Sequence, residues 1–393
     1  MDANVQTSQF VPKCGSGLRE YHSIIRAPRA AYGSAPAGGF ETRQYEFEAQ
    51  LQAVLAALIG ISEVQDVRFV RFYLSDAANQ QAVLEQAIGA LPAALSGVPV
   101  SIIGQPPLDG TKIAAWVYST EGEVRDCELI WDARMRGGAA KPAGNSEDSG
   151  VFGAAGVCAD GTPRGAEGDS EAQMSGIFGR YSEVLGERGL SVARDCIRTW
   201  IYVHDVDVNY PGVVRGRRQF FNTIGLTPQT HFIASTGIEG RSCDPHCTVV
   251  MDALAVRGLR PEQLRYLHAY DHLSPTADYG VTFERGTAVQ FSDRIHIYIS
   301  GTASIDSKGQ VLYPGDVRKQ TFRMLENIAA LLAEAGAGPE DAAVATVYLR
   351  DMADYLTVKE IIESELPRLN AVYVLAPVCR PAWLVEMECI AII

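Results

Sequence analysis

The sequence is poor in cysteine, and the cysteines that it has are scattered. Eight of the 393 residues are cysteines, and they are spread from the first residues to the last strand. Small secreted domains that depend on disulfides carry their cysteines at a much higher density. The spacing therefore excludes a disulfide framework, and we expect a reduced, cytoplasmic protein.

Basic residues are outnumbered, and long apolar runs are missing. The chain has 34 Lys and Arg residues against 47 Asp and Glu residues, which gives a formal net charge of −13. This balance argues against nucleic acid or an anionic membrane as the main partner, so an anionic substrate would need a local cluster of arginines. No apolar run approaches the length of a membrane span, and residues 1–4 lack the features of a signal peptide. We expect no association with a membrane.

Metal and phosphate motifs are also lacking. The seven histidines form no metal-binding helix motif, and no glycine-rich phosphate loop follows a predicted strand. Cys243, His246 and Cys247 lie close together, but a structural zinc site needs four ligands and no second pair is spaced to complete it. We therefore expect neither a metal nor another cofactor.

What the chain does contain is a repeat. The order helix, strand, helix, strand, strand occurs three times, and each first strand ends in the pattern apolar-Tyr-aliphatic-x-Asp. The three signatures are residues 72–76, 201–205 and 347–351. They predict three related α+β units, in which the Asp caps the helix that follows.

The repeat also predicts the domain boundaries. We expect a first unit over residues 1–135, a second over 171–257 and a third over 258–393. Residues 136–170 are rich in Gly, Ala, Ser and Asp, which is typical of a mobile surface insertion. A loop that covers a functional site can have a similar composition, but we favour this interpretation less.

The last predicted strand carries the strongest functional signal. Glu386 and Glu388 are two residues apart and share one face of that strand, together with Leu384, Ile390 and Ile392. A buried carboxylate is costly unless something stabilises or uses it. The pattern favours the wall of a pocket over a half-buried strand whose glutamates point to solvent.

Arginines near strands are the candidates for binding an anion. Arg285 and Arg380 border strands and small residues, where a rigidly held guanidinium group can clamp a carboxylate. Arg215 shares one turn of a predicted helix with Arg217 and Arg218, and for these last two we expect solvated surface positions.

Two tyrosines and one short segment are weaker candidates. Tyr210 and Tyr279 can supply hydroxyl donors to a ligand or pack in the core with their hydroxyls satisfied. Gly301 and Thr302 follow a predicted strand, where small residues let the backbone approach a ligand closely.

Several stretches resemble a known superfamily. The third unit resembles the YjgF/RidA family, which forms trimers with ligand sites between subunits, through residues 301–303, 320–328, 347–351 and 384–392. Further stretches resemble one specialised branch of it, the chorismatases, and these are 198–202, 205–210, 230–240 and 279–287. The second resemblance extends from about residue 177 to the C-terminus, whereas the first unit matches only in its pattern.

The resemblance implies both a fold and an activity. The fold is α+β, with three tandem Rid-like (chorismate-mutase-like) units arranged as a pseudo-trimer within a monomer and an active site between the second and third units. The activity is the cofactor-free removal of pyruvate from chorismate, with Glu386 as the acid that protonates the enol ether. The residues implied to hold the substrate are Arg380, Arg285, Arg198, Arg215, Tyr210, Tyr279, Gly301 and Thr302.

The expected product follows from a feature that distinguishes members of that branch. In members that form 3-hydroxybenzoate a cysteine lies seven residues before the glutamate, as Cys379 does here. This spacing favours 3-hydroxybenzoate, although Cys379 could instead be a small buried filler. Ser292 departs from the Gly or Ala expected at its position, which puts the product in question.

Three other functions stay open. Chorismate hydrolysis would give a dihydroxycyclohexadiene carboxylate, and the typical Rid activity is hydrolysis of imines or enamines. A module that binds a ligand without turning it over is the third, because a fold does not determine a function.

Overall fold

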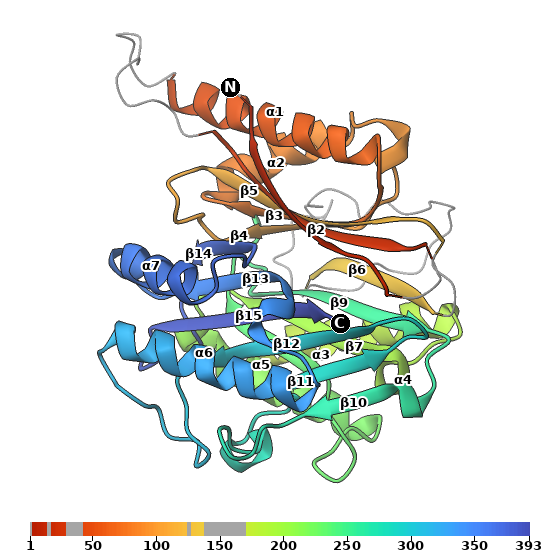
Figure 1. Ribbon diagram of the computed structural model, residues 1–393, viewed down its shortest axis with the longest axis vertical. Helices are drawn as coiled ribbons and strands as arrows, with labels where there is room; N and C mark the ends of the chain where they lie inside the picture. Colours follow the sequence, from red (N-terminus) through yellow and green to blue (C-terminus); the bar gives the residue numbers. More distant parts are fainter. Residues whose placement is uncertain (1, 14–16, 29–41, 124–126, 137–169) are drawn as a thin grey trace, which may run out of the picture.

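The computed structural model describes residues 2–13, 17–28, 42–123, 127–136 and 170–393. Apart from its two end residues, the predicted insertion 136–170 lies outside these ranges. Three mixed sheets of five, four and six strands account for the strands of the described residues. Figure 1 shows the first sheet at the top and the strands of the other two sheets together below it, with helices on the outside.

The first unit is a five-stranded sheet with two long helices against it. Its strands follow the order β1-β2-β5-β3-β4. The elements are β1 (Asn4–Phe10), β2 (Arg19–Arg26), α1 (Thr42–Ser62), β3 (Asp66–Leu74), α2 (Ala77–Ile88), η1 (Ala93–Leu95), β4 (Val100–Gly104) and β5 (Ile113–Glu121). Apolar residues at helical spacing direct one face of α1 toward the core, and the buried ones are Phe47, Leu51, Val54, Leu55 and Leu58.

The second unit has a four-stranded sheet in the order β6-β9-β7-β8. Its elements are β6 (Glu128–Arg136), α3 (Ser170–Glu187), α4 (Val192–Asp195), β7 (Cys196–Val203), α5 (Val206–Thr223), β8 (Ala234–Glu239) and β9 (Val249–Arg257). The expected first unit, 1–135, was too long, because β6 pairs with β9 of the second sheet. The second unit therefore begins before Glu128, and the 136–170 segment falls inside it.

The third unit has the largest sheet, in the order β10-β11-β12-β15-β13-β14. Its strands are β10 (Leu264–Leu267), β11 (Gly286–Gln290), β12 (Ile295–Ala303), β13 (Ala342–Leu349), β14 (Ala371–Leu375) and β15 (Val385–Ile392). Its helices are η2 (Pro261–Gln263), η3 (Thr276–Tyr279), α6 (Val317–Glu334), η4 (Pro339–Asp341), η5 (Met352–Asp354) and α7 (Tyr355–Glu365).

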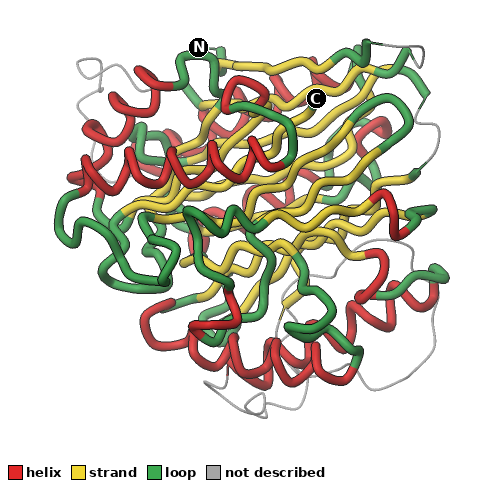
Figure 2. The backbone as a smooth tube through the Cα atoms, turned by 60° about the horizontal axis from the view of Figure 1, so that its bottom comes forward, coloured by secondary structure: helices red, strands yellow, loops and turns green. Residues whose placement is uncertain are grey.

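The three sheets share one plan, as the repeat predicts. In each, the last strand lies between an antiparallel partner and the strand that carries the Tyr signature, which pairs in parallel with the strand after the second helix. Each unit contacts the other two near the strand that follows its second helix, which is β4, β8 or β14. The contacts are the isolated β-bridges Gly104–Arg241, Ile238–Val378 and Pro107–Val374. These three bridges close a ring, so the units form the expected pseudo-trimer. Figure 2 shows the strands gathered in the interior and the helices around them.

The signature aspartates cap helices at two of the three positions. Asp76 accepts a hydrogen bond from the backbone N–H of Asn79, and Asp351 accepts one from Ala353. Asp205 has a left-handed backbone (φ 50°) and makes no such bond. There the carboxylate of Glu239 accepts the N–H groups of Asp205 and Val206 instead, so the cap of α5 comes from β8.

A buried charged cluster joins the three sheets. Arg71 of β3 donates from Nη2 to Asp252 of β9 (2.9 Å), and Arg198 of β7 donates from Nη2 to Glu388 of β15 (2.6 Å). Trp200 donates from Nε1 to the other oxygen of Glu388 (2.8 Å). Because each buried charge has an opposite partner, the cluster fixes β15 against both other units. In the described residues, no helix combines the length and apolar character needed to cross a membrane.

Candidate active site

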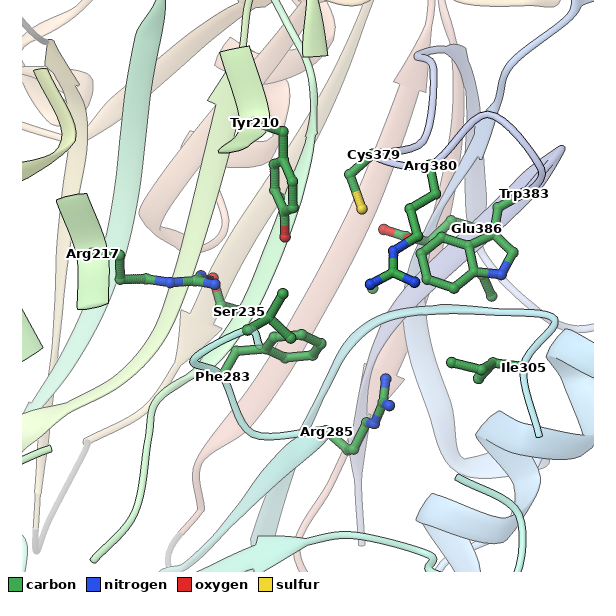
Figure 3. A pocket seen from close by; sticks show the side chains of 14 residues that line it. Tyr210, Arg217, Ser235, Phe283, Arg285, Ile305, Cys379, Arg380, Trp383 and Glu386 are labelled. Carbon is green, nitrogen blue, oxygen red and sulfur yellow. Dashed lines mark hydrogen bonds between the residues drawn. The ribbon is translucent and has the colours of Figure 1, made fainter. Parts of the chain in front are cut away.

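A cavity lies between the second and third units, and its empty volume, together with the open space at its mouth, is about 520 Å³. The second unit contributes residues from α5 and β8, and the third contributes residues from β12, β15 and three loops. The residues that line it are Tyr210, Arg217, Ser235, Gly237, Val281, Phe283, Arg285, Gly301, Ala303, Ile305, Cys379, Arg380, Trp383 and Glu386. Figure 3 shows Arg217 facing Arg380 and Glu386 across this space, with Phe283 between them.

Glu386 is the acidic residue of the cavity. On β15 it pairs with Tyr348 of β13 and Ala303 of β12, and its side chain is buried. Burial raises the pKa of this carboxyl to about 8, the negative charge of Glu388 adds to the effect, and Arg198 and Arg285 oppose it. Gly301 lies against the carboxyl so closely that a Cβ there would collide with Oε1 of Glu386. The glycine therefore makes room for a carboxylic acid that is mostly protonated at neutral pH.

Glu388 shares the strand face with Glu386 but has a structural role. Its carboxylate accepts hydrogen bonds from Arg198 and Trp200, and also from the hydroxyl of Thr236. These three donors fix it behind the cavity wall, and it does not line the cavity. Of the two carboxylates predicted to face a pocket, only Glu386 does so.

Arg285 and Arg380 both line the cavity on the side of Glu386. The guanidinium group of Arg285 donates to the carbonyl of Ser274 (3.0 Å) and lies 5.4 Å from the ring centroid of Phe283. Arg380 lies 5.2 Å from the ring centroid of Trp383. Packing on aromatic rings holds both cations in place without neutralising them.

Arg217 lines the cavity from the side of the second unit. It was expected on the surface, yet it is buried, with Nε donating to Thr282 Oγ1 (2.9 Å) and Nη1 to Ser235 Oγ (3.3 Å). Its Nη2 is buried without a hydrogen-bond partner among the described residues. The sequence contained a signal for this burial. Val213 lies four residues before Arg217 and Phe221 lies four residues after it, which places Arg217 on the apolar face of α5.

Arg215, by contrast, does not belong to the site. It pairs with Glu171 of α3 (2.5 Å), and its side chain is 57% exposed. A separation of two residues turns a helical side chain by about 200°, so Arg215 and Arg217 point in opposite directions.

Arg198 and Thr302, which were expected to hold substrate, do not line this cavity. Arg198 is bound to Glu388 in the buried charged cluster, outside the cavity. Thr302 alternates with Gly301 and Ala303 along β12, so it faces away from the cavity and its hydroxyl donates to the carbonyl of Ser300 (2.9 Å).

Tyr210 and Cys379 lie in the cavity beside each other. The ring of Tyr210 covers Gly237, where a Cβ would come within 2.7 Å of Cε2, and its hydroxyl lies next to Arg217 and Cys379. Burial, followed by the charge of Glu386, raises the pKa of the Cys379 thiol to about 12. The sulfur is therefore a thiol at neutral pH. Tyr279 ends η3, and its side chain lies outside the described part of the structure.

Ser292 is not a site residue. It is exposed in the turn between β11 and β12, at the end of β12 remote from Gly301. Its departure from Gly or Ala therefore has no bearing on the cavity. The small residues that shape the wall are Ser235, Gly237, Gly301 and Ala303.

The cavity offers guanidinium groups, a thiol and one carboxylic acid. This set suits a small organic anion and a proton transfer better than a metal ion. Among the residues that the structure describes, no three His, Cys, Asp or Glu side chains converge to hold a metal. Cys243, His246 and Cys247 therefore form no such group.

The third unit matches known protein families in sequence. A family model described as Endoribonuclease L-PSP matches residues 285–393. A RutC family protein from Pyrococcus abyssi is 36% identical over 97 residues, which cover 24% of this chain and 76% of that protein. The 3-aminoacrylate deaminase RutC from Acinetobacter baylyi is 30% identical over 97 residues, which cover 24% and 77%. The chain belongs to the RutC family, within the YjgF/RidA-like superfamily.

The likeness to one solved structure extends over the whole chain. The crystal structure of a chorismatase at 1.08 Å resolution covers 95% of this chain and 98% of its own, with a TM-score of 0.59 and 18% identity. The chain thus has the chorismatase fold, and the resemblance found in the sequence is confirmed at that level.

Proposed function

We propose that this protein is a chorismatase that releases pyruvate from chorismate without a cofactor and forms 3-hydroxybenzoate. The observation that carries the proposal is Glu386, a carboxylic acid with a pKa of about 8, in a cavity with Arg217, Arg285 and Arg380. Chorismate is a small dianion with an acid-labile enol ether. It needs cations for its carboxylates and one proton donor, and the cavity contains both.

The distribution of charge favours one orientation of the substrate. Arg285 and Arg380 lie on the same side as Glu386, and Arg217 lies across the cavity (Figure 3). The enolpyruvyl carboxylate, which is next to the methylene that takes the proton, fits Arg285 and Arg380. The ring carboxylate then reaches the buried Nη2 of Arg217. Charge-assisted bonds at both ends would position the methylene at the carboxyl of Glu386.

The proposed reaction begins with a proton from Glu386 to the methylene carbon. The bond between ring C3 and the ether oxygen breaks, and its electron pair stays on that oxygen, which becomes the keto oxygen of pyruvate. The oxygen of the neighbouring C4 hydroxyl bonds to C3 and releases its proton to Glu386, which restores the acid. The C4–O bond of the resulting epoxide breaks, C3 loses its proton and the oxygen that stays on C3 gains one, which gives 3-hydroxybenzoate. No water is consumed.

Cys379 has a defined place in this scheme. Because its thiol stays protonated, it is a poor nucleophile and a weak hydrogen-bond donor. It lies beside Tyr210 on the cavity wall, where both groups can direct a ring oxygen toward C3.

The test is a coupled pyruvate assay with chorismate, with the aromatic product separated by chromatography. We expect pyruvate and 3-hydroxybenzoate in equal amounts. Glu386→Gln should lose about 10²–10⁴-fold in rate, as for removal of a general acid. A wild-type rate no higher than the spontaneous one would overturn the proposal.

A second candidate is hydrolysis of imines or enamines. The observation that favours it is the 30% identity to a 3-aminoacrylate deaminase over the third unit. Release of ammonia from 3-aminoacrylate, without pyruvate from chorismate, would support this reading. Binding of either compound with no turnover, unchanged in Glu386→Gln, would point instead to a module that only binds its ligand.

A further inference from the structure

One segment of the third unit crosses over to the second unit and forms a wall of the cavity. It is residues 281–285, the end of the connection that leads from β10 to β11, and we refer to it as the cover segment. In the described part of the chain, neither β10 nor this connection has a counterpart in the sheet orders of the other two units.

The cover segment has two faces. Val281, Phe283 and Arg285 line the cavity, whereas Thr282 and Glu284 between them do not. This alternation is that of an extended strand, and Glu284 forms an isolated parallel bridge with Ala234 at the edge of β8.

The outer face is fastened to the second unit. Thr282 Oγ1 accepts a hydrogen bond from Nε of Arg217 (2.9 Å), and the backbone N–H of Glu284 donates to the carbonyl of Ile233 (3.1 Å). The N–H of Phe232 donates to the carboxylate of Glu284 (2.7 Å). These buried hydrogen bonds fasten the cover segment to the second unit, beside the cavity.

The inner face of the cover segment carries two apolar side chains that are largely shielded from solvent. Val281 is 7% exposed and Phe283 is 9% exposed, so little of either side chain reaches bulk water. Phe283 lies between Arg217 and Ile305 in Figure 3, on the path across the cavity. Two apolar side chains that bulk water hardly reaches therefore border the same cavity as Glu386.

The chemistry gives this separation a consequence, which rests on the proposed function. The route to 3-hydroxybenzoate consumes no water. In the competing hydrolysis, a water oxygen bonds to the cationic enolpyruvyl carbon after protonation, and the hemiketal breaks into pyruvate and a dihydroxycyclohexadiene carboxylate, so one water is taken up. Access of water to that carbon decides between the two products.

We propose that Val281 and Phe283 of the cover segment determine the product by excluding water from the cation formed at Glu386. The cover segment thus sets specificity, while Glu386 supplies the proton. Arg285 packs on Phe283, so the aromatic ring also has a part in positioning the guanidinium group.

The experiment measures the ratio of dihydroxydiene to 3-hydroxybenzoate made from chorismate by the full-length protein. Phe283→Ala should raise this ratio about tenfold, the order expected when one apolar wall contact is lost. Phe283→Leu keeps the wall apolar but loses the ring under Arg285, so KM should rise while the ratio stays within about twofold. Phe322→Ala on α6, which removes an aromatic side chain that is 42% exposed and does not line the cavity, is the control.

Each outcome decides the matter. Pyruvate release by the wild type with an unchanged ratio in Phe283→Ala would overturn the role of the cover segment and leave the proposed function standing. A wild type that makes mainly the dihydroxydiene would also overturn it, whereas no pyruvate at all would remove the proposed function itself. Should Phe283→Ala fail to fold by thermal denaturation, Val281→Ala is the second variant, and the same ratio supports or refutes the inference.

Discussion

Glu386 and Glu388 are two residues apart on one strand, yet their surroundings give them opposite tasks. Glu388 accepts three hydrogen bonds and is paired with Arg198, whereas no hydrogen bond to Glu386 is present among the described residues. Burial therefore raises the pKa of Glu386, whereas Glu388 is the counter-ion of Arg198. The functional difference between them depends on what faces each carboxyl rather than on the strand.

The pH dependence of the reaction follows from the raised pKa of Glu386. The acid must be protonated to act, so kcat/KM for pyruvate release should be level below pH 8 and fall about tenfold per pH unit well above it. Initial rates between pH 6 and pH 10 measure this. A rate that instead rises through pH 8 would mean that Glu386 acts as a base, as hydrolysis of an imine could require.

The same pKa predicts a change in stability. The pKa of Glu386 rises from 4.5 to about 8 on folding, so the folded state binds the extra proton in this interval. The contribution to stability is full below pH 4.5 and is lost as the pH rises to 8. Glu386→Gln should therefore melt several degrees above the wild type at pH 9 and close to it at pH 5. Equal melting temperatures at pH 9 would contradict the raised pKa.

Arg217 and Arg215 provide a matched pair on one helix. Arg217→Met removes the cation facing the proposed ring carboxylate, so KM for chorismate should rise about 10- to 100-fold. Arg215→Met removes an exposed cation outside the cavity and should change KM less than about twofold. Steady-state kinetics of both variants, with Arg217→Lys to retain the charge, measure the difference. Equal effects in the two Met variants would exclude the assigned subsite.

At the scale of single elements, the local pattern predicts much of the structure. The repeated order of helices and strands and the helix caps at Asp76 and Asp351 were predicted, because periodicity and caps are local properties. The first domain boundary was wrong because β6 pairs with β9, more than a hundred residues away. The pairing of Arg198 with Glu388 could not be predicted for the same reason, since Glu388 lies on the last strand, 190 residues away.

The buried charged cluster makes β15 sensitive to one substitution. Glu388→Gln leaves Arg198 buried without a full counter-charge, which should lower the free energy of unfolding by about 3–5 kcal/mol. Urea denaturation at pH 7 measures this. Glu386→Gln on the same face of the same strand is the control, because it removes no paired charge and should not destabilise the protein.

At the scale of the whole molecule, the three interfaces are alike in plan and different in chemistry. The position of Glu386, opposite the signature Tyr348, is taken by Ala114 opposite Tyr73 and by Val250 opposite Tyr202. The equivalent positions of the other two units therefore carry no carboxylic acid. The interface between the second and third units combines this acid with three arginines.

This difference predicts the binding stoichiometry. Glu386→Gln, which should bind chorismate without converting it, is expected to take up one molecule per chain in a calorimetric titration. Light scattering of the same sample should give the mass of a single chain, because the ring of units is already closed within it. Two or three equal sites per chain would contradict the assignment of the acid.

The ring of bridges among β4, β8 and β14 also bears on how such a protein can evolve. In a trimer of identical subunits, one change in the gene is copied into every interface, and each interface must tolerate it. Here the three copies are encoded separately. One interface is free to acquire a cover segment and an acid, while the other two interfaces keep small or apolar residues and hold the ring together.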